Sequence, residues 1–526
     1  MSGVRSSVGS SIRQTRGFSE TGLWLQPSMS QSRLRDEFPL SARPALIAFR
    51  TPDTVHPIRP IDPVITFRNS QHEAVRGTLT NVQRRSLVME IYNPYSIVQV
   101  SEVLSDLTIR SGERSIYKGK AVVVRLLNTG LMAVVSVTLI DEWNELAAIG
   151  QDGKSVADEA RSFVESWNTR FNVRRDYQVV VSEMRAYFSE ITRWIDQADI
   201  KTGLPRAEDG RVREDVFLDL ARPLLGKGRE YLQRFEDEAG LVDPELASVH
   251  RSFAQAAIHP LILRAPFVYR TFAKPLGYAG DYEMVNQILG DPRQGPSTYF
   301  QLVNYMFLQA GVAVAHRNRI DILCDGLNKL AASAVQAGRT MRVLNVGCGP
   351  AVEIQRFARE NPHSDMLEFV LVDFSEETLE YTRQRLEDAS RPTGRKLKFT
   401  LQHESVNQLL KRTTRMQNVL PEERFDYVYC AGLFDYLTDK VCTRLVEYFV
   451  SRSRPGGRIL VTNVHSSNPE RNWMEHFLEW YLIYRDEASL VGAMPAGLDV
   501  VETYTDPIGV NVFVEALVRN ADPMPP

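Results

Sequence analysis

Four different patterns of apolar and polar positions follow one another along the chain. Residues 1–58 are rich in Ser, Arg and Pro and have no steady apolar period, which predicts a disordered tail. Residues 59–150 contain short β-branched runs separated by Gly, Asn-Pro and Ser-Gly breaks, which are typical of a small β-barrel or sandwich. Residues 151–335 repeat apolar positions at three- and four-residue steps, as amphipathic helices do. Residues 336–520 alternate between strand and helix patterns.

The last stretch predicts a sheet of defined connectivity. Two apolar runs near its end, 498–504 and 510–518, are joined only by residues 505–509, so they predict a hairpin with one antiparallel strand. Earlier runs are separated by helical patterns and predict parallel strands of a doubly wound sheet, at 341–346, 368–373, 396–402, 425–430 and 457–464. A long helix is expected from about Glu470. The expected fold class is therefore multidomain α/β, with a seven-stranded Rossmann-like C-terminal domain, a central helical domain and a small N-terminal β-barrel.

Composition and charge remove several function classes. The 526 residues carry a net charge of -3, so no basic field favours nucleic acid or an anionic membrane. The longest apolar stretch with few interruptions, 305–315, contains Gln309 and is too short to span a bilayer. We expect a cytoplasmic protein without a bound metal, because the cysteines form no CxxC or zinc spacing; they are Cys324, Cys348, Cys430 and Cys442. A mitochondrial transit peptide is an alternative for the first 19 residues, which contain Arg and Ser but no acid.

A nucleotide-sized crevice is predicted where the first two strands of the last domain end. Gly347 and Gly349 follow the first strand, and glycines there let a ligand approach the backbone closely. Asp373 ends the second strand, where a carboxylate can accept hydrogen bonds from two ribose hydroxyls. The alternative for Asp373 is a helix cap, although Ser375 and Glu376 can fill that role.

The whole C-terminal domain resembles the class I methyltransferases, and this resemblance implies S-adenosyl-L-methionine as cofactor. By analogy, the glycine loop faces the methionine and ribose, Phe374 flanks the adenine, and the end of the fourth strand lies under the methionyl part. The cofactor contacts that the resemblance implies are Asn345, Gly347, Cys348, Gly349, Pro350, Asp373, Phe374, Ser375, Ser405, Val406, Cys430, Ala431 and Gly432. Asn345 stands where the family usually has an acid, and Ala351 where it usually has a third glycine.

The acceptor chemistry depends on whether the acceptor is already ionised. A carboxylate needs no general base, whereas an alcohol or phenol needs one. Candidates for catalytic contacts are Asp435 and Tyr436 after the fourth strand and His465 after the fifth. Each has a structural alternative, as a helix cap, a core side chain or a partner in a turn.

Aromatic side chains recur at helical spacing in the long helix expected from Glu470. They predict a stripe on one face that either belongs to the core or forms an apolar wall for a fatty or aromatic substrate. Its members are Trp473, Phe477, Trp480, Tyr481 and Tyr484, of which Trp473 and Trp480 are the candidate substrate contacts.

Three long segments resemble a more specific bacterial family. Residues 270–289, 430–437 and 463–486 look like the 3-hydroxypalmitic acid methyl ester synthases. The resemblance implies a helical domain that acts as a lid and a methyl-esterified 3-hydroxy fatty acid as a signalling product. Within the first segment, two glycines, two cations and two tyrosines crowd a short non-helical stretch that we expect to contact the substrate or close over the cofactor. These lid candidates are Arg270, Lys274, Tyr278, Gly280, Asp281 and Tyr282.

The N-terminal barrel is similar to PilZ-type domains, which bind cyclic di-GMP. The arginine arm of that family does not precede the first strand here, and the turn from Asn81 to Ser86 keeps Asn81 but loses the usual Ser and Gly. Arg84 and Arg85 are the remaining candidates for phosphate contacts. We therefore expect a packing or interaction domain. The rival to an active enzyme is a PilZ-like regulatory protein whose methyltransferase fold binds cofactor without turnover, and a nucleic-acid methyltransferase is disfavoured by the balanced charge.

Overall fold

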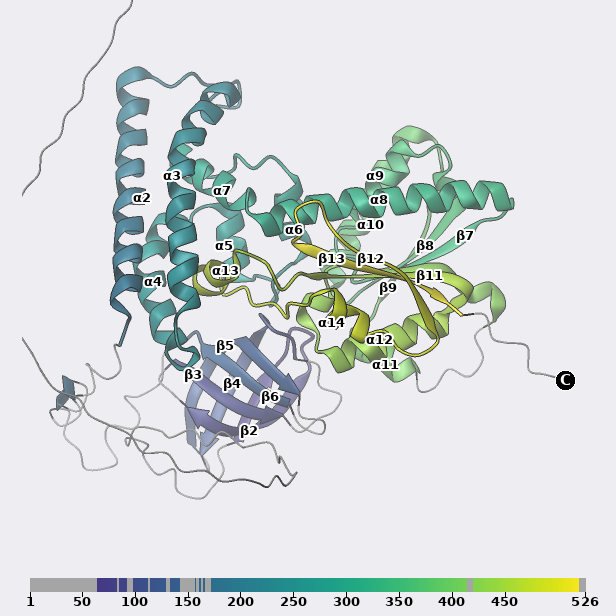
Figure 1. Ribbon diagram of the computed structural model, residues 1–526, viewed down its shortest axis with the longest axis horizontal. Coiled ribbons are helices and arrows are strands. Elements are labelled where there is room, and N and C mark those ends of the chain that lie inside the picture. Colours follow the sequence, from purple (N-terminus) through teal and green to yellow (C-terminus); the bar gives the residue numbers. More distant parts are fainter. Residues whose placement is uncertain are drawn as a thin grey trace, which may run out of the picture. The chain divides into compact units, whose positions relative to one another are not determined.

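The computed structural model describes residues 64–82, 85–91, 98–111, 114–128, 133–141, 157, 160–161, 164–165, 172–413 and 420–519 (Figure 1). The predicted disordered tail, residues 1–58, lies outside the described residues, and so does Arg84.

Six strands near the N-terminus form a closed antiparallel barrel in the order β1-β2-β3-β6-β5-β4. Alternate side chains point inward, as the burial pattern of β3 shows, and they form a core that includes Ile65, Met89 and Leu104. The predicted small barrel is confirmed. The strands are β1 (Val64–Arg68), β2 (Ala74–Val82), β3 (Ser86–Ile91), β4 (Val103–Ser111), β5 (Arg114–Asn128) and β6 (Ala133–Leu139).

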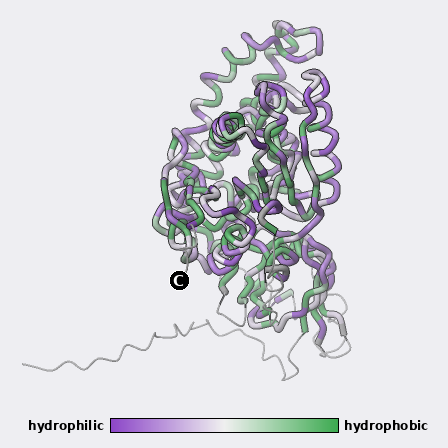
Figure 2. Tube along the Cα trace, turned by 90° about the vertical axis from the view of Figure 1, so that its right-hand side faces the viewer, coloured by the Kyte–Doolittle hydropathy of each residue, from purple (hydrophilic) through white to green (hydrophobic). Residues whose placement is uncertain are grey.

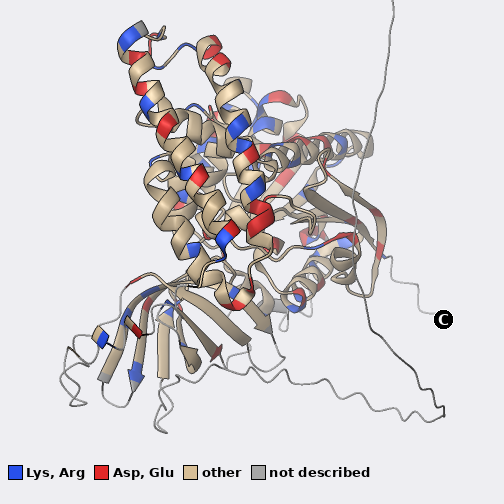
Figure 3. Cartoon of the chain, turned by 60° about the vertical axis from the view of Figure 1, so that its left-hand side comes forward, with Lys and Arg blue, Asp and Glu red and all other residues tan. Residues whose placement is uncertain are grey.

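The central region is helical, as predicted. Its apolar faces share one core that includes Tyr177, Phe217 and Phe267, and Figure 2 shows hydrophobic and hydrophilic residues alternating along its helices. Acidic and basic residues are interspersed along the same helices (Figure 3). The helices are α2 (Arg175–Thr202), α3 (Glu214–Gly240), α4 (Ala247–Ile262), α5 (Pro266–Ala273), α6 (Tyr282–Leu289), α7 (Thr298–Leu308) and α8 (Gly311–Ala337). No helix in the described part of the chain is both long and apolar enough to cross a membrane.

The C-terminal region contains the predicted seven-stranded sheet, in the order β12-β13-β11-β10-β7-β8-β9. Only β13 runs antiparallel to its neighbours, because it returns from β12 through a tight hairpin and inserts beside β11. The predicted parallel sheet with a terminal hairpin is confirmed. The strands are β7 (Met341–Val346), β8 (Leu367–Asp373), β9 (Lys398–His403), β10 (Phe425–Cys430), β11 (Ser453–Val464), β12 (Leu498–Thr505) and β13 (Asn511–Val518).

Helices cover both faces of this sheet (Figure 1). One face packs against α8, α9 (Val352–Glu360) and α10 (Glu376–Ser390). The other packs against α11 (Val406–Thr413), α12 (Asp439–Arg452) and α14 (Glu487–Gly492). Helix α8 joins two cores, because its first half packs in the helical region and its second half on the sheet. It therefore crosses the boundary predicted at residue 335.

The prediction of a long helix from Glu470 is wrong. Helix α13 spans only Arg471–Phe477. Glu479 then takes a left-handed backbone conformation, with φ of 49°, and the chain continues extended, where Ile483 N–H donates to Asp435 O at 2.7 Å. The aromatic residues consequently do not share one face. Trp473 packs in the helical core, whereas Tyr481 packs against Val100 and Val122 of the barrel region.

Candidate active site

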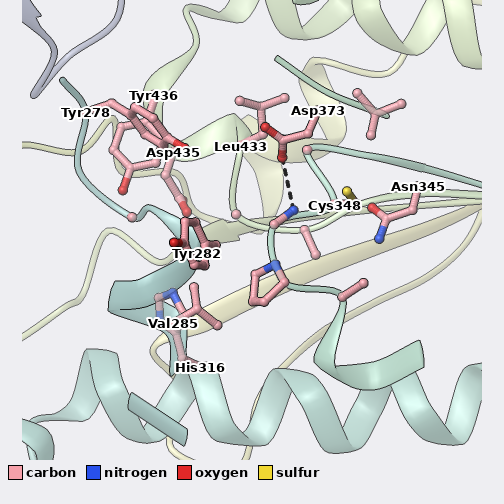
Figure 4. A pocket seen from close by; sticks show the side chains of 18 of the residues that line it. Tyr278, Tyr282, Val285, His316, Asn345, Cys348, Asp373, Leu433, Asp435 and Tyr436 are labelled. Atoms are coloured by element: carbon pink, nitrogen blue, oxygen red, sulfur yellow. Dashed lines mark hydrogen bonds between the residues drawn. The ribbon is translucent and has the colours of Figure 1, made fainter. Parts of the chain in front are cut away.

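One cavity lies where the strands β7, β8 and β10 end, between α8, the segment 278–282 and the extended stretch after α13. Its empty volume is about 1210 Å³, including the part open to solvent. The predicted site residues that line it are Asn345, Gly347, Cys348, Gly349, Pro350, Asp373, Phe374, Val406, Ala431, Gly432, Asp435, Tyr436, Tyr278, Gly280, Tyr282 and Trp480. Figure 4 shows side chains of this set pointing toward one another around the cavity.

The loop after β7 forms the floor of this cavity. Gly347 and Gly349 have φ of 72° and 50°, a region that glycine enters without strain. Gly347 N–H donates to Val372 O at 2.9 Å, which ties the loop to β8. Ala351, which stands where the resemblance leads one to expect a third glycine, also has a left-handed φ of 49°. The loop therefore keeps the backbone shape of a glycine-rich turn at the price of some strain at Ala351.

Asp373 points from the end of β8 toward this loop (Figure 4). Its Oδ2 accepts a hydrogen bond from Gly349 N–H at 3.1 Å, and its Oδ1 accepts one from Ser375 N–H at 3.0 Å. The carboxyl is buried, which raises its pKa, and the two backbone donors oppose that shift. The cap of α10 is Ser375, whose Oγ accepts from Thr378 N–H. Asp373 is therefore not the helix cap, and its carboxylate has lone pairs left for a ligand in the cavity.

Three residues that line the cavity, Asn345, Glu353 and Tyr429, form a buried polar cluster. Glu353 Oε1 accepts hydrogen bonds from Tyr429 OH at 2.7 Å and from Asn345 Nδ2 at 3.2 Å. Burial raises the pKa of Glu353. Sequence reasoning missed Glu353 and Tyr429, because an acid in the first turn of a helix and a tyrosine in a strand are both ordinary.

Asp435 and Tyr436 stand in a single helical turn (Phe434–Tyr436) directly after β10. Asp435 Oδ1 accepts from Val464 N–H at 2.6 Å, and burial raises the pKa of this carboxyl to about 6. The hydroxyl of Tyr436 accepts from Trp480 Nε1–H at 3.0 Å, and burial raises its pKa above the ordinary range. Arg485 fixes this turn, because its guanidinium donates to Phe434 O at 2.8 Å and to other groups around it.

Two polar residues on α8 also line the cavity, His316 and Arg319, and sequence reasoning missed both. His316 Nδ1 donates to Val312 O at 2.9 Å, since a carbonyl can only accept. Burial lowers the pKa of His316 to about 3, so the ring is neutral and its Nε2 is an acceptor. Four polar residues in succession, from His316 to Arg319, follow an apolar turn, and no pattern in the sequence marks which of them face inward.

Two tyrosines of the predicted lid segment, Tyr278 and Tyr282, line the cavity. The ring of Tyr278 lies 4.9 Å from that of Phe374, and Tyr282 OH donates to Glu377 Oε1 at 2.9 Å. Gly280 has φ of 80°, and a Cβ at this position would lie 2.8 Å from the hydroxyl of Tyr436. Only glycine thus allows the segment to approach the turn after β10 this closely.

Three other lid candidates build the segment and do not line the cavity. Arg270 Nε pairs with Asp281 Oδ1 at 2.7 Å, and the same oxygen accepts from Met284 N–H to begin α6. Lys274 is buried, donates to Leu478 O at 3.2 Å, and has a pKa lowered by burial to about 8. These contacts connect the segment to the end of α13.

The remaining predicted residues lie outside the cavity. His465 contacts Ser467 and Glu487, with its Nε2 3.1 Å from Glu487 Oε2. Trp473 lines a different depression beside α3 and α7. Cys430 is buried within β10. Ser375 and Ser405 line an adjoining groove that reaches the turn between β1 and β2.

Strand order, the single antiparallel strand and the crevice between β7 and β8 define a Rossmann-like methyltransferase domain. A family model described as a methyltransferase domain matches residues 338–491. The C-terminal region is therefore an S-adenosylmethionine-dependent methyltransferase domain, as the sequence predicted.

Several solved structures are similar to part of the chain. One is a possible exported protein from Bordetella parapertussis, with 17% identity and a TM-score of 0.36, which covers 48% of this chain and 86% of its own. Another is magnesium protoporphyrin IX methyltransferase from Synechocystis PCC 6803 with bound S-adenosylhomocysteine, with 14% identity and a TM-score of 0.31, which covers 48% and 98%. The N-methyltransferase NodS from Bradyrhizobium japonicum WM9 has 13% identity and a TM-score of 0.29, and covers 45% and 98%. No curated protein matches the chain.

Proposed function

We propose that this protein transfers a methyl group from S-adenosylmethionine to the carboxylate of a small apolar acid, and that the acid is a 3-hydroxy fatty acid. The observation that carries the proposal is that one cavity joins the Gly347–Gly349 loop and Asp373 to an aromatic and aliphatic wall under a lid. A donor and an acceptor can therefore meet in a space largely shielded from water.

The residues of the crevice fit a nucleoside. The space beside Gly349 is open, since no atom lies within 4 Å of where its Cβ would stand. We assign the ribose hydroxyls to Asp373 and one face of the adenine to Phe374. The other predicted cofactor contacts that line the cavity would surround the methionyl part, and Ser405 and Ser375 would stand at the adenine edge through the adjoining groove. When bound, S-adenosylmethionine supplies an electrophilic methyl group.

The chain's own groups orient the acceptor and exclude water. A carboxylate acceptor is ionised at neutral pH and needs no base. Trp480 and Leu482 offer apolar surface for an alkyl chain, while Tyr436 OH, which accepts from Trp480, retains its proton for donation to an acceptor oxygen. Asp435 is the group whose raised pKa of about 6 would suit proton removal from a hydroxyl acceptor. Because His465 lies outside the cavity, we assign the acceptor contacts to Asp435 and Tyr436.

The choice of a 3-hydroxy fatty acid rests on the segments 270–289, 430–437 and 463–486. Each of these segments contributes to the cavity lining: the first through Gly280, the second through Asp435 and the third through Trp480. The parts of the chain that resemble the 3-hydroxypalmitic acid methyl ester synthases are thus the parts that would surround the acceptor.

We propose that the PilZ-like barrel packs against the lid and does not serve as a nucleotide sensor. Val103 N–H donates to Gly277 O at 2.7 Å, and Ser101 Oγ donates to Tyr481 O at 3.0 Å. Arg85, a candidate for phosphate contacts, donates to Ser252 Oγ of α4. These contacts support a barrel that holds the lid segment and the stretch after α13 in position.

The test is a methyl-transfer assay with the full chain, methyl-labelled S-adenosylmethionine and 3-hydroxyhexadecanoic acid. The expected product is extracted into organic solvent and loses its label as methanol on mild alkaline hydrolysis, as a methyl ester does. The methyl ester of the same acid, whose carboxyl is blocked, is the control acceptor and should stay unlabelled. Label that appears only on a protein or a phenol of a cell extract would refute the acceptor and leave the enzyme class standing.

A further inference from the structure

Arg319 is buried and finds no hydrogen-bond or ion-pair partner in the part of the chain that the structure describes. It lies on α8 one turn after His316 and lines the cavity, and only 6% of the residue is exposed. Its guanidinium makes no hydrogen bond or ion pair with any described residue, and its Nη1 is buried without an acceptor. An arginine stays charged in proteins, so its N–H groups require acceptors that the described side chains do not supply.

The backbone at the end of β10 is shaped to receive this guanidinium. Gly432 has φ of 95°, and a Cβ there would lie 3.1 Å from both Nη1 and Nη2 of Arg319. The absence of a side chain at Gly432 therefore lets the guanidinium rest against the strand end, on the floor of the cavity.

The nearby carboxyls do not satisfy Arg319. Glu353 Oε1 is occupied by Tyr429 and Asn345. Asp435 Oδ1 accepts from Val464 N–H. Both acids influence Arg319 through longer-range charge attraction, yet neither comes within ion-pair distance of it among the described residues. A hydrogen-bonding anion is still missing at the guanidinium.

We propose that Arg319 is the anchor of a carboxylate-binding subsite in this cavity. A carboxylate matches a guanidinium in shape and charge, and can accept two parallel N–H bonds from it. This inference rests on the proposed function, which places two carboxylates in the cavity: that of the donor's methionyl part and that of the acceptor. The chemistry at Arg319 is the same for both sources.

The experiment separates the two sources by binding and by kinetics on the full chain. S-Adenosylhomocysteine carries the amino-acid carboxylate, whereas 5′-methylthioadenosine is the same thioether nucleoside without it. Both are titrated calorimetrically against the unsubstituted chain, Arg319→Gln and Arg319→Lys, and the KM for 3-hydroxyhexadecanoic acid is measured for each. Arg317→Gln is the matched control, because Arg317 lies on the same helix, does not line the cavity and donates to Ile288 O and Leu308 O instead.

If Arg319 binds the carboxylate of the donor, Arg319→Gln weakens the affinity for S-adenosylhomocysteine by roughly tenfold to a hundredfold and leaves the affinity for 5′-methylthioadenosine unchanged. If Arg319 instead binds the carboxylate of the acceptor, both nucleosides bind normally and the KM for the acid rises by a similar factor, with kcat little changed. Arg319→Lys should recover part of either loss, since it keeps the charge but not the paired donors.

Two results would overturn the subsite. One is an unchanged affinity and KM in Arg319→Gln; the other is an equal loss for both nucleosides, which would make Arg319 a purely structural residue. Failure of the unsubstituted chain to bind either nucleoside would instead defeat the proposed function itself, so the two failures are distinguishable. Circular dichroism of each variant verifies that it is folded.

Discussion

The close approach of the lid to the turn after β10 can be tested with a pair of glycine substitutions. Gly280 and Gly277 have nearly the same φ, 80° and 85°. An alanine at either position would bear the left-handed strain of about 1–2 kcal/mol. They differ in surroundings: a Cβ at 280 would lie 2.8 Å from the hydroxyl of Tyr436, whereas the nearest atom at 277 is a Ser70 carbon at 3.7 Å.

The extra effect of Gly280→Ala follows from the fixed phenol. Tyr436 is half-buried against the helical core and its hydroxyl accepts a hydrogen bond from Trp480 Nε1–H, so the hydroxyl cannot move aside freely. Overpacking a well-packed site costs about 1–3 kcal/mol. We expect this overpacking cost to oppose lid closure in Gly280→Ala, in addition to the backbone strain that both substitutions cause. That difference corresponds to about a 5- to 150-fold lower kcat/KM.

The assay is methyl transfer under kcat/KM conditions for both variants and the unsubstituted chain. Thermal unfolding of the same samples reports the strain that the two substitutions have in common. Equal kcat/KM values for Gly280→Ala and Gly277→Ala would refute the reasoning, because the contact with Tyr436 would then have no part in closure.

Three further outcomes are expected. Asp373→Ala should weaken the binding of S-adenosylhomocysteine by about 1–3 kcal/mol in calorimetry through the lost hydroxyl acceptors, and an unchanged affinity would remove the ribose assignment. Burial raises the pKa of Glu102 from its ordinary 4.5 to about 7. This group therefore contributes stability that is present below pH 4.5 and lost as the pH rises through 7. Denaturant titrations of Glu102→Gln should show a free energy of unfolding that depends less on pH between these values, and the same pH dependence as the unsubstituted chain would contradict this prediction. Arg485→Met should lower the free energy of unfolding by about 1–3 kcal/mol for each buried carbonyl that loses its donor, as Phe434 O and Leu437 O do. A loss below 1 kcal/mol in urea unfolding would argue against the role of Arg485 in fixing the turn after β10.

Much of the fold follows from local patterns in the sequence. Buried strands such as 341–346 and 425–430 are predominantly apolar, because helices cover both faces of the sheet. The short connection before β13 leaves room for a hairpin alone. The positions of Gly347, Gly349 and Asp373 could be predicted for the same reason, since strand ends in such a sheet meet at one edge.

The errors arise where long-range contacts override local periodicity. Residues 471–486 have a helical pattern, yet the helix ends at Phe477 because the following backbone finds partners elsewhere. Ile483 N–H reaches Asp435 O, and Lys274 Nζ, from a distant segment, reaches Leu478 O. No local signal announces such contacts. For the same reason, His316 and Arg319 could not be selected in advance from a helix that carries several polar residues.

The central claim is that a nucleoside is held between the Gly347–Gly349 loop and Asp373. The most direct measurement is a crystal structure of the full chain with S-adenosylhomocysteine. We expect both ribose hydroxyls within hydrogen-bond distance of the Asp373 carboxylate and the adenine against Phe374. A nucleoside bound elsewhere, or an Asp373 side chain turned away from a ligand in this crevice, would contradict the account.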